Sequence, residues 1–266
     1  MIHSFSCAKC GRCYAECHLQ ADAIRLTNDG VSIDLDKCSR CGHCAAVCPT
    51  GQLDNPLAPL CEEVGDVLSP DAALRFLRTA RSVRQYKADE VPRNVLAQLL
   101  NAGRYPQTAC NSQGIGYIVV QGREKVDAIH ALYDQIAGEL PPDHPDFDNV
   151  NYPVQVQRER GDFDALFYGC PQLIFTISDV SNHRAAKSAQ FTMTFLALMA
   201  PSLGLGTCWS GQMAAAIACT PSAMARFGAL IGLPEGKQIC GCLMVGYPNV
   251  TFRRLAERDP LEVYWN

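Results

Sequence analysis

Two hydrophobic periods along residues 71–266 predict a domain built from both helices and strands. A spacing of three to four residues, typical of a helix with one buried face, joins two sets of side chains. These sets are Val95, Leu96, Leu99, Leu100 and Gly103, and then Val126, Ile129, Tyr133 and Ile136. Short apolar runs predict strands over 115–120, 173–177 and 239–245. Helices and strands that follow no strict alternation favour an α+β fold.

Three other stretches of this region have patterns of their own. Ser69-Pro70-Asp71 is typical of a helix start and predicts a helix that continues to about residue 79. Residues 191–200 are apolar almost all round, which predicts a central helix. Residues 141–163 are rich in proline and acidic side chains, so we expect an irregular loop or a lid there.

The first fifty residues instead contain an internal repeat whose halves are separated by a hairpin. Residues 23–26 and 31–34 alternate apolar and polar side chains on either side of Asn28-Asp29-Gly30, which predicts two antiparallel strands. Residues after Gly51 include several prolines and few apolar positions. We therefore expect three parts: a small domain over 1–58, a linker over 59–70 and a larger domain over 71–266.

Cysteine spacing is the strongest chemical signal in the chain. The run C-x2-C-x2-C-x3-C occurs twice. The runs are formed by Cys7, Cys10, Cys13 and Cys17, and by Cys38, Cys41, Cys44 and Cys48. This spacing places three thiolates around one cubane cluster and directs the fourth to another cluster. The two runs therefore predict two [4Fe–4S] clusters and the transfer of single electrons.

Zinc and disulfides are the competing interpretations of these cysteines. Zinc takes paired C-x2-C units in one tetrahedral site, which leaves the third and fourth cysteines of each run unexplained. Disulfides rank below zinc because the chain has 266 residues and the cysteines have metal-ligand spacing.

Composition and charge exclude several other classes of protein. Apolar residues make up 48% and charged residues 19% of the chain, as in ordinary globular proteins. The net charge of −4 gives no reason to expect nucleic acid or an anionic membrane as partner. The sequence shows neither a signal peptide nor a membrane span, so we expect a cytoplasmic location.

Three segments of the larger domain carry candidate cofactor chemistry. Arg81-Ser82-Val83-Arg84 places two guanidinium groups and a hydroxyl close together, a set that suits a phosphate. Short amide and hydroxyl side chains form a turn over 108–114, and a glycine-rich turn over 204–211 lets backbone N–H groups approach a ligand. Taken alone, the basic segment is more typical of solvated surface charge, and the turn over 108–114 is also typical of an ordinary loop. The glycine-rich turn lacks the G-x-G-x-x-G pattern, which disfavours a Rossmann site.

The small domain resembles the bacterial two-cluster ferredoxins. The resemblance implies that the fourth cysteine of each run crosses over to the other cluster. One cluster would then be held by Cys7, Cys10, Cys13 and Cys48, and the other by Cys17, Cys38, Cys41 and Cys44. The second run ends in the family's proline, Pro49, whereas the first ends in His18.

The larger domain resembles the FMN-dependent nitroreductase family, because the three segments occur in the family's order and a matching tail follows over 246–261. The whole chain is thus similar to ferredoxin-fused nitroreductases. This resemblance implies a sheet-and-helix fold and a homodimer whose subunits share each flavin. The chain departs from the family at three places. Ala80 stands where arginine is frequent, Gly114-Ile115 stands in place of Pro-Trp, and Ser188 stands in place of an acidic residue.

The resemblance also implies an FMN-binding role for ten residues. Phosphate, ribityl and pyrimidine contacts would come from Arg81, Ser82 and Arg84, and isoalloxazine contacts from Asn111 and Gln113. The ring would pass beside Trp209, Ser210 and Gly211, and further phosphate contacts would come from Arg254 and Arg258. No side-chain nucleophile is expected, because the chemistry would take place on FMN.

These features predict an oxidoreductase that takes electrons from an external low-potential donor, such as a ferredoxin. The electrons would pass through two clusters to FMN and on to a nitroaromatic, a quinone or an activated alkene. Two alternatives remain open: an electron-transfer or redox-sensing module without small-molecule turnover, and a NAD(P)H-dependent flavin reductase. Seven further cysteines are expected to be mostly buried small hydrophobes: Cys61, Cys110, Cys170, Cys208, Cys219, Cys240 and Cys242.

Overall fold

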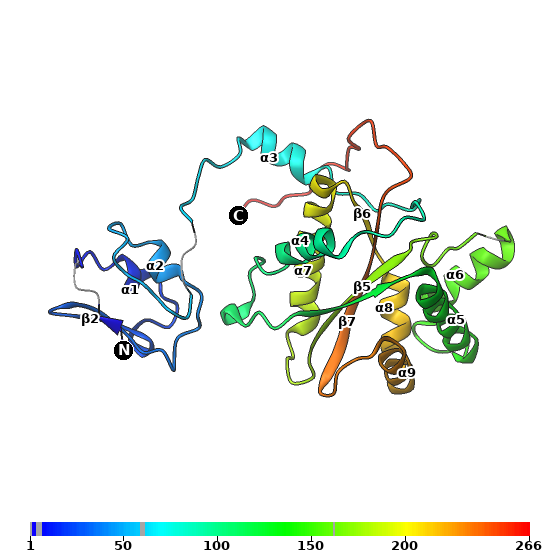
Figure 1. The fold of residues 1–266 in the computed structure, drawn as a ribbon, viewed down its shortest axis with the longest axis horizontal. Helices are drawn as coiled ribbons and strands as arrows, with labels where there is room; N and C mark the ends of the chain where they lie inside the picture. The colour runs from blue at the N-terminus through cyan, green and yellow to red at the C-terminus, as the bar shows by residue number, and fades with distance from the viewer. Residues whose placement is uncertain (1, 4–6, 59–61, 162) are drawn as a thin grey trace. The chain divides into compact units, whose positions relative to one another are not determined.

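The chain divides into two compact units (Figure 1). The computed structural model describes residues 2–3, 7–58, 62–161 and 163–266. The first unit contains Met1–Leu68 and Thr108–Ser112, and the second contains Ser69–Gln107 and Gln113–Asn266. The grouping of Thr108–Ser112 with the first unit is not predicted by the sequence. The finer boundaries at 58 and 70 stay a prediction, and Cys61 lies outside the described residues.

The first unit is a small antiparallel sheet with short helices. Its strands are β1 (Ile2–His3), β2 (Ile24–Thr27) and β3 (Gly30–Ile33), in the order β1-β3-β2. Thr27 pairs with Gly30 across the turn, so the predicted hairpin is confirmed. The sequence pattern does not predict β1, since two residues carry no period.

Both helices of this unit begin directly after a glycine with left-handed backbone. The helical elements are α1 (Arg12–Glu16), η1 (Gln20–Asp22) and α2 (His43–Ala46). Gly11 has φ 72° before α1, and Gly42 has φ 75° before α2. Glycine adopts this conformation without a steric penalty, so the two cysteine runs turn into their helices in the same way.

The second unit is built on a four-stranded antiparallel sheet. Its strands are β4 (Gly116–Gln121), β5 (Gln172–Asp179), β6 (Gly206–Trp209) and β7 (Lys237–Gly246), in the order β4-β5-β7-β6. Three of these strands confirm the predictions over 115–120, 173–177 and 239–245. The sequence does not predict β6, because a four-residue strand that opens with glycine resembles a turn.

Helices cover both faces of this sheet (Figure 1). The helices of the second unit are α3 (Pro70–Leu77), α4 (Arg93–Ala102), α5 (Arg123–Glu139), α6 (Phe147–Arg160), α7 (Ala185–Met199), η3 (Ala200–Leu203), α8 (Gly211–Ala218) and α9 (Pro221–Ile231). The short helix η2 (Ala109–Asn111) belongs to the first unit. The predicted start of α3 and the predicted faces of α4 and α5 are confirmed. Ser69 caps α3 by accepting a hydrogen bond from Ala72 N, and Gly103 directly follows α4.

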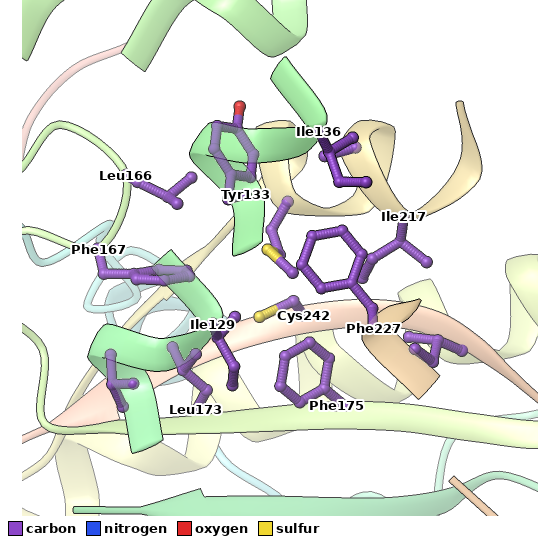
Figure 2. Packing of buried hydrophobic residues seen from close by; sticks show 14 of the residues in the cluster. Ile129, Tyr133, Ile136, Leu166, Phe167, Leu173, Phe175, Ile217, Phe227 and Cys242 are labelled. Atoms are coloured by element: carbon purple, nitrogen blue, oxygen red, sulfur yellow. The ribbon is translucent and has the colours of Figure 1, made fainter. Parts of the chain in front are cut away.

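Alternate residues of the central strands face two separate cores. Leu173 and Phe175 of β5 pack with α5, α6, α8 and α9, whereas Ile174 between them packs with α4 and α7. Figure 2 shows the first core, in which Phe175 and Phe227 lie around Cys242. This packing of helices on both faces of an antiparallel sheet confirms the predicted α+β class.

The prediction of an irregular loop or lid over 141–163 is wrong. Most of this stretch forms α6, which includes Pro153 within the helix. Val150 and Pro153 are buried, and Tyr133 Oη donates a hydrogen bond to the Val150 carbonyl at 2.6 Å. Asn151 Nδ2 also donates to the Ala137 carbonyl at 3.2 Å. Packing against α5 therefore outweighs the local cost of proline.

The predicted helix over 191–200 is confirmed as the second half of α7, but the expectation that it is central is wrong, because only one of its faces is buried. Ala189, Met193 and Leu196 lie in the interior, whereas Phe191 is 56% exposed. Within the described residues, no single helix is both long and apolar enough to cross a membrane. The consecutive helices α8 and α9 meet that test only as a pair, and they are bent by 115°.

Candidate functional site

The cysteines of the two runs gather around two small cavities in the first unit. One cavity is lined by Cys7, Cys10, Cys13 and Cys48. The other is lined by Cys17, Cys38, Cys41 and Cys44. These are the sets that crossover of the fourth cysteine implies, although their role as ligands stays a prediction. Within the described residues, no group of three or more potential ligands has the geometry for a single metal ion.

Matching backbone donors point at one sulfur in each cavity. Lys9 N donates to Cys7 Sγ at 3.3 Å, and Arg40 N donates to Cys38 Sγ at 3.4 Å. Both donors lie in left-handed residues, with φ 54° for Lys9 and φ 59° for Arg40. Backbone held in this sparsely populated region costs energy. N–H groups directed at sulfur are the donors that suit a thiolate-bound cluster.

Burial and hydrogen bonding act in opposite directions on these thiols. Burial raises the pKa of Cys13 and that of Cys44. Burial also acts to raise the pKa of Cys48, but hydrogen bonds from Thr50 and from nearby backbone groups outweigh it and lower that pKa to about 7. A lower pKa favours the thiolate, which is the form that binds metal.

A larger cavity of the second unit lies where residues 81–84 run beside strand β6. Ser82 forms a parallel bridge with Thr207, and Val83 N donates to the Thr207 carbonyl at 2.9 Å. Gly206 allows this close approach, since a Cβ there would lie 2.6 Å from Cγ2 of Val83. The fold thus holds Arg81 and Ser82 next to the end of β6.

This cavity of about 510 Å³ combines positive charge with apolar walls. Its lining includes Arg81, Ser82, Met193, Ala197, Thr207, Cys208, Trp209, Leu243 and Arg258. A neighbouring cavity of about 400 Å³ shares Arg81 and Thr207 and adds Arg78 and Arg254. The predicted residues Arg81, Ser82, Trp209, Arg254 and Arg258 are therefore brought together around two adjoining spaces. The guanidinium groups suit a phosphate, and the apolar walls suit a flat ring.

Comparison with known proteins identifies both parts of the chain. Residues 77–247 match the model of the Nitroreductase family, and residues 1–50 match that of a 4Fe-4S dicluster domain. The chain belongs to the nitroreductase family. Its N-terminal part is a 4Fe-4S dicluster domain, so both resemblances drawn from the sequence are confirmed, and with them the expectation of an oxidoreductase.

Solved structures support the fold of this nitroreductase-family protein. A nitroreductase with bound FMN from Bacteroides fragilis NCTC 9343 is 21% identical, covers 73% of this chain and 98% of its own, and has a TM-score of 0.56. A second, also with bound FMN, from Desulfitobacterium hafniense DCB-2, is 23% identical, with coverages of 72% and 97% and a TM-score of 0.56. An FMN-dependent nitroreductase from Clostridium difficile R20291 is 17% identical, with coverages of 74% and 100% and a TM-score of 0.55. The comparison with curated proteins found no match.

Several predicted site residues of the nitroreductase-family domain lie outside the lining of the two cavities. Ser210 is buried and caps α8, because its hydroxyl accepts a hydrogen bond from Met213 N at 3.3 Å. Gly211 is the first residue of that helix. The guanidinium carbon of Arg84 lies 5.8 Å from the ring centre of Tyr168. The FMN-binding roles of these residues stay predictions.

The two predicted amide residues lie in a strained turn. Cys110, Asn111 and Gln113 all have left-handed backbone, with φ between 47° and 54°. Asn111 Nδ2 donates to the Ser39 carbonyl at 3.0 Å, and both residues belong to the first unit. Gln113 belongs to the second unit. The predicted contact of these two side chains with a flavin ring is not tested by this arrangement.

Sequence reasoning did not identify several residues of the cavities. Arg78 lies at the end of α3 and lines the second cavity, while Met193 and Ala197 of α7 line the first. Burial raises the pKa of Cys208, a further lining residue, although a hydrogen bond with Ser82 opposes that effect. The apolar period of 191–200 indicates a buried helix, but it does not distinguish residues that face a core from those that face a cavity.

Proposed function

We propose that this protein is an iron–sulfur flavoprotein that passes electrons from two [4Fe–4S] clusters to FMN and on to a small organic acceptor. The acceptor is a nitroaromatic, a quinone or an activated alkene. One observation carries the proposal: a single chain combines two four-cysteine cavities with one cavity that joins arginines to apolar walls. Such a chain can couple one-electron and two-electron chemistry.

The chemistry of the larger cavity fits FMN. Arg81 and Arg258 offer positive charge for the phosphate, and Ser82 offers a hydroxyl for the polar chain. Met193 and Leu243 offer apolar surface for the ring. The structures from Bacteroides fragilis and Desulfitobacterium hafniense contain FMN in the same fold, which supports the same cofactor here. The family resemblance adds Arg84, Asn111, Gln113, Ser210, Gly211 and Arg254 as further FMN contacts.

The chain's own residues bind and orient the cofactors. When bound, each [4Fe–4S] cluster supplies single electrons, and FMN supplies the exchange between single electrons and pairs. The guanidinium groups of Arg81 and Arg258 stabilise negative charge beside them. Trp209 is 52% exposed at the cavity, where it offers a flat surface to an acceptor. No side chain acts as a nucleophile in this proposal.

A homodimer, an external electron donor and a cytoplasmic location complete the proposal. Phe191 on α7 is exposed, and it directly follows Gln190 in the sequence. Gln190 lines the larger cavity. A second copy of the chain would cover this apolar side chain and enclose the cavity. The donor is a ferredoxin or a similar low-potential protein, which suits cysteine-bound clusters. Sedimentation of the holoprotein tests the dimer, since a monomer at micromolar concentration would contradict it.

An anaerobic single-turnover experiment tests the proposed function. The protein is purified without oxygen, its FMN, iron and sulfide are measured, and it is then fully reduced. It is mixed separately with a nitroarene, a quinone and an enone while flavin and cluster absorbance are followed. Rapid flavin reoxidation by one class identifies the acceptor. Protein that contains no flavin, or that none of the three reoxidises, would overturn the proposal.

A further inference from the structure

A buried asparagine lies against one of the two four-cysteine sites. Asn55 is 1% exposed, and its Nδ2 atom lies 3.6 Å from Cys38 Sγ and 3.9 Å from Cys44 Sγ. Both sulfurs line the cavity that also contains Cys17 and Cys41. A buried amide normally satisfies its hydrogen-bonding groups, and here the amide nitrogen has two sulfurs as acceptors.

The local turn fixes the direction in which this amide points. Asn55 Oδ1 accepts a hydrogen bond from Leu57 N at 3.1 Å, and the Asn55 carbonyl accepts one from Ala58 N at 2.8 Å. A reversed amide would place its nitrogen against the Leu57 N–H, donor against donor. The turn therefore directs the NH2 group toward the sulfurs.

The other cavity has a weaker counterpart of this contact. There, Thr50 Oγ1 lies 3.5 Å from Cys48 Sγ, and both residues are more exposed than Asn55. The donors Lys9 N and Arg40 N are matched between the two cavities, and the other cavity has further backbone donors to Cys48. The buried amide that reaches two sulfurs is thus a clear asymmetry between otherwise repeated sites.

Hydrogen bonds to ligand sulfurs have a known electrostatic consequence. Reduction adds one negative charge to a cluster and its thiolates. Donors aimed at the sulfurs stabilise the more negative form and so raise the reduction potential. The effect is stronger in a buried environment, where the local dielectric constant is low.

We infer that Asn55 selectively raises the reduction potential of the cluster held by Cys17, Cys38, Cys41 and Cys44. This inference rests on the proposed function, in which each four-cysteine site holds a [4Fe–4S] cluster. Asn55 acts as a positioning and tuning residue, because it contacts ligand sulfurs and no reacting atom. Asn55 thus contributes to the difference in potential between the two clusters, and that difference biases where a single electron resides.

The test is an anaerobic redox titration of the full-length protein, followed by electron paramagnetic resonance. Asn55→Leu keeps a similar side-chain volume and removes the donor. We expect the equilibrium constant for reduction of one cluster to fall about tenfold. For a one-electron couple, this corresponds to a reduction potential lower by about 59 mV. The potential of the other cluster should stay unchanged.

Two further variants separate the donor from the turn and one site from the other. Asn55→Ser retains an oxygen that accepts from Leu57 N, but its hydroxyl is too short to reach the sulfurs, so the same cluster should shift in the same direction. Thr50→Val is the matched control for the other site and should move only the second signal.

Iron and sulfide contents keep this inference distinct from the proposed function. Unmodified protein with less iron than two [4Fe–4S] clusters require would contradict the proposed function itself. With both clusters present, unchanged potentials or equal shifts in the Asn55 variants would overturn the tuning role. Loss of the cluster from both Asn55 variants would also overturn it, since Asn55 would then serve assembly.

Discussion

The two kinds of cavity in this protein lie in very different surroundings. In the described part of the first unit, the buried apolar residues other than cysteine are Ala23, Ile24, Val31, Ile33, Ala45 and Leu53. The arginine-lined cavity lies in a unit whose sheet carries a core on each face. So small a core cannot balance the conformational entropy of such a segment, whereas metal ligation can supply folding energy. We therefore expect the first unit to depend on its clusters and the second on its own packing.

Loss of a cluster should have the largest effect, and that effect should be confined to the first unit. In Cys41→Ala, we expect one cluster to be lost and the first unit to lose protection against amide hydrogen exchange. FMN content and exchange in the second unit should stay unchanged, because its cores contain no cluster ligand. Cys219→Ala, outside the runs, is the control and should retain all iron. Simultaneous loss of FMN in Cys41→Ala would show that the two units do not have separate stabilities.

Arg81→Ala should have the next largest effect, and it acts on the second unit alone. A hydrogen bond to a charged group contributes about 1.5–3 kcal/mol, so FMN affinity should fall by roughly 10–100-fold. Fluorescence titration of the apoprotein with FMN measures this change. Arg75→Ala, on the exposed side of α3, should bind FMN as the unmodified protein does. Equal affinity of all three proteins would remove Arg81 from the site.

Gly206→Ala tests whether packing of residues 82 and 83 against β6 supports both the stability of the second unit and its FMN site. The added methyl group would overlap Val83, so overpacking should lower the free energy of unfolding by about 1–3 kcal/mol and weaken FMN binding. Gly138→Ala is the matched control, because a Cβ there meets nothing within 4 Å. Within helix α5, that substitution should stabilise by about 0.5–1 kcal/mol. Chemical denaturation of both variants measures the two effects.

The smallest expected effect is a pH dependence confined to the second unit. Hydrogen bonds with Asp134 and Asp164 raise the pKa of His130 from 6.5 to about 9. Burial opposes ionisation of Asp164, but hydrogen bonds with His130 and nearby backbone groups lower its pKa from 3.8 to about 2. The stabilisation due to His130 is therefore complete below pH 6.5 and is lost as the pH rises through about 9. That due to Asp164 is present above pH 3.8 and is lost as the pH falls through about 2.

Denaturation of His130→Gln and of the unmodified protein across this range tests the dependence. The difference in unfolding free energy should shrink between pH 6.5 and about 9. His183→Gln, at an exposed position, is the control and should follow the unmodified protein. A constant difference across that interval would contradict the assignment of charge to His130.

Sequence patterns predicted most of the fold because long periodic segments report burial directly. The faces of α4 and α5, three strands of the larger sheet and the hairpin of the first unit all follow from spacing. Strand β6 was not predicted because it is short and begins with glycine. Helix α6 was not predicted because its proline and acidic composition indicate a loop, and its burial against α5 outweighs them.

The cysteine site was more accessible to sequence reasoning than the arginine-lined cavity. Its candidate ligands lie in two short runs, and their spacing is itself the signal. The larger cavity is assembled from residues 80–82, α7, β6, β7 and the tail, so its lining depends on packing. Asn55 illustrates the limit: no motif marks it, and its orientation toward Cys38 and Cys44 depends on a turn that only the fold defines.

The bridge between Ser82 and Thr207 has a consequence for how chains behave together in solution. β6 is the terminal strand of its sheet, and such strands expose backbone groups that can pair with another molecule. Residues 82 and 83 occupy part of that edge, since Val83 N donates to the Thr207 carbonyl. The segment that presents Arg81 to the cavity thus also shields the sheet from self-association. Protein in which this segment is displaced should aggregate more readily, even before its second unit unfolds.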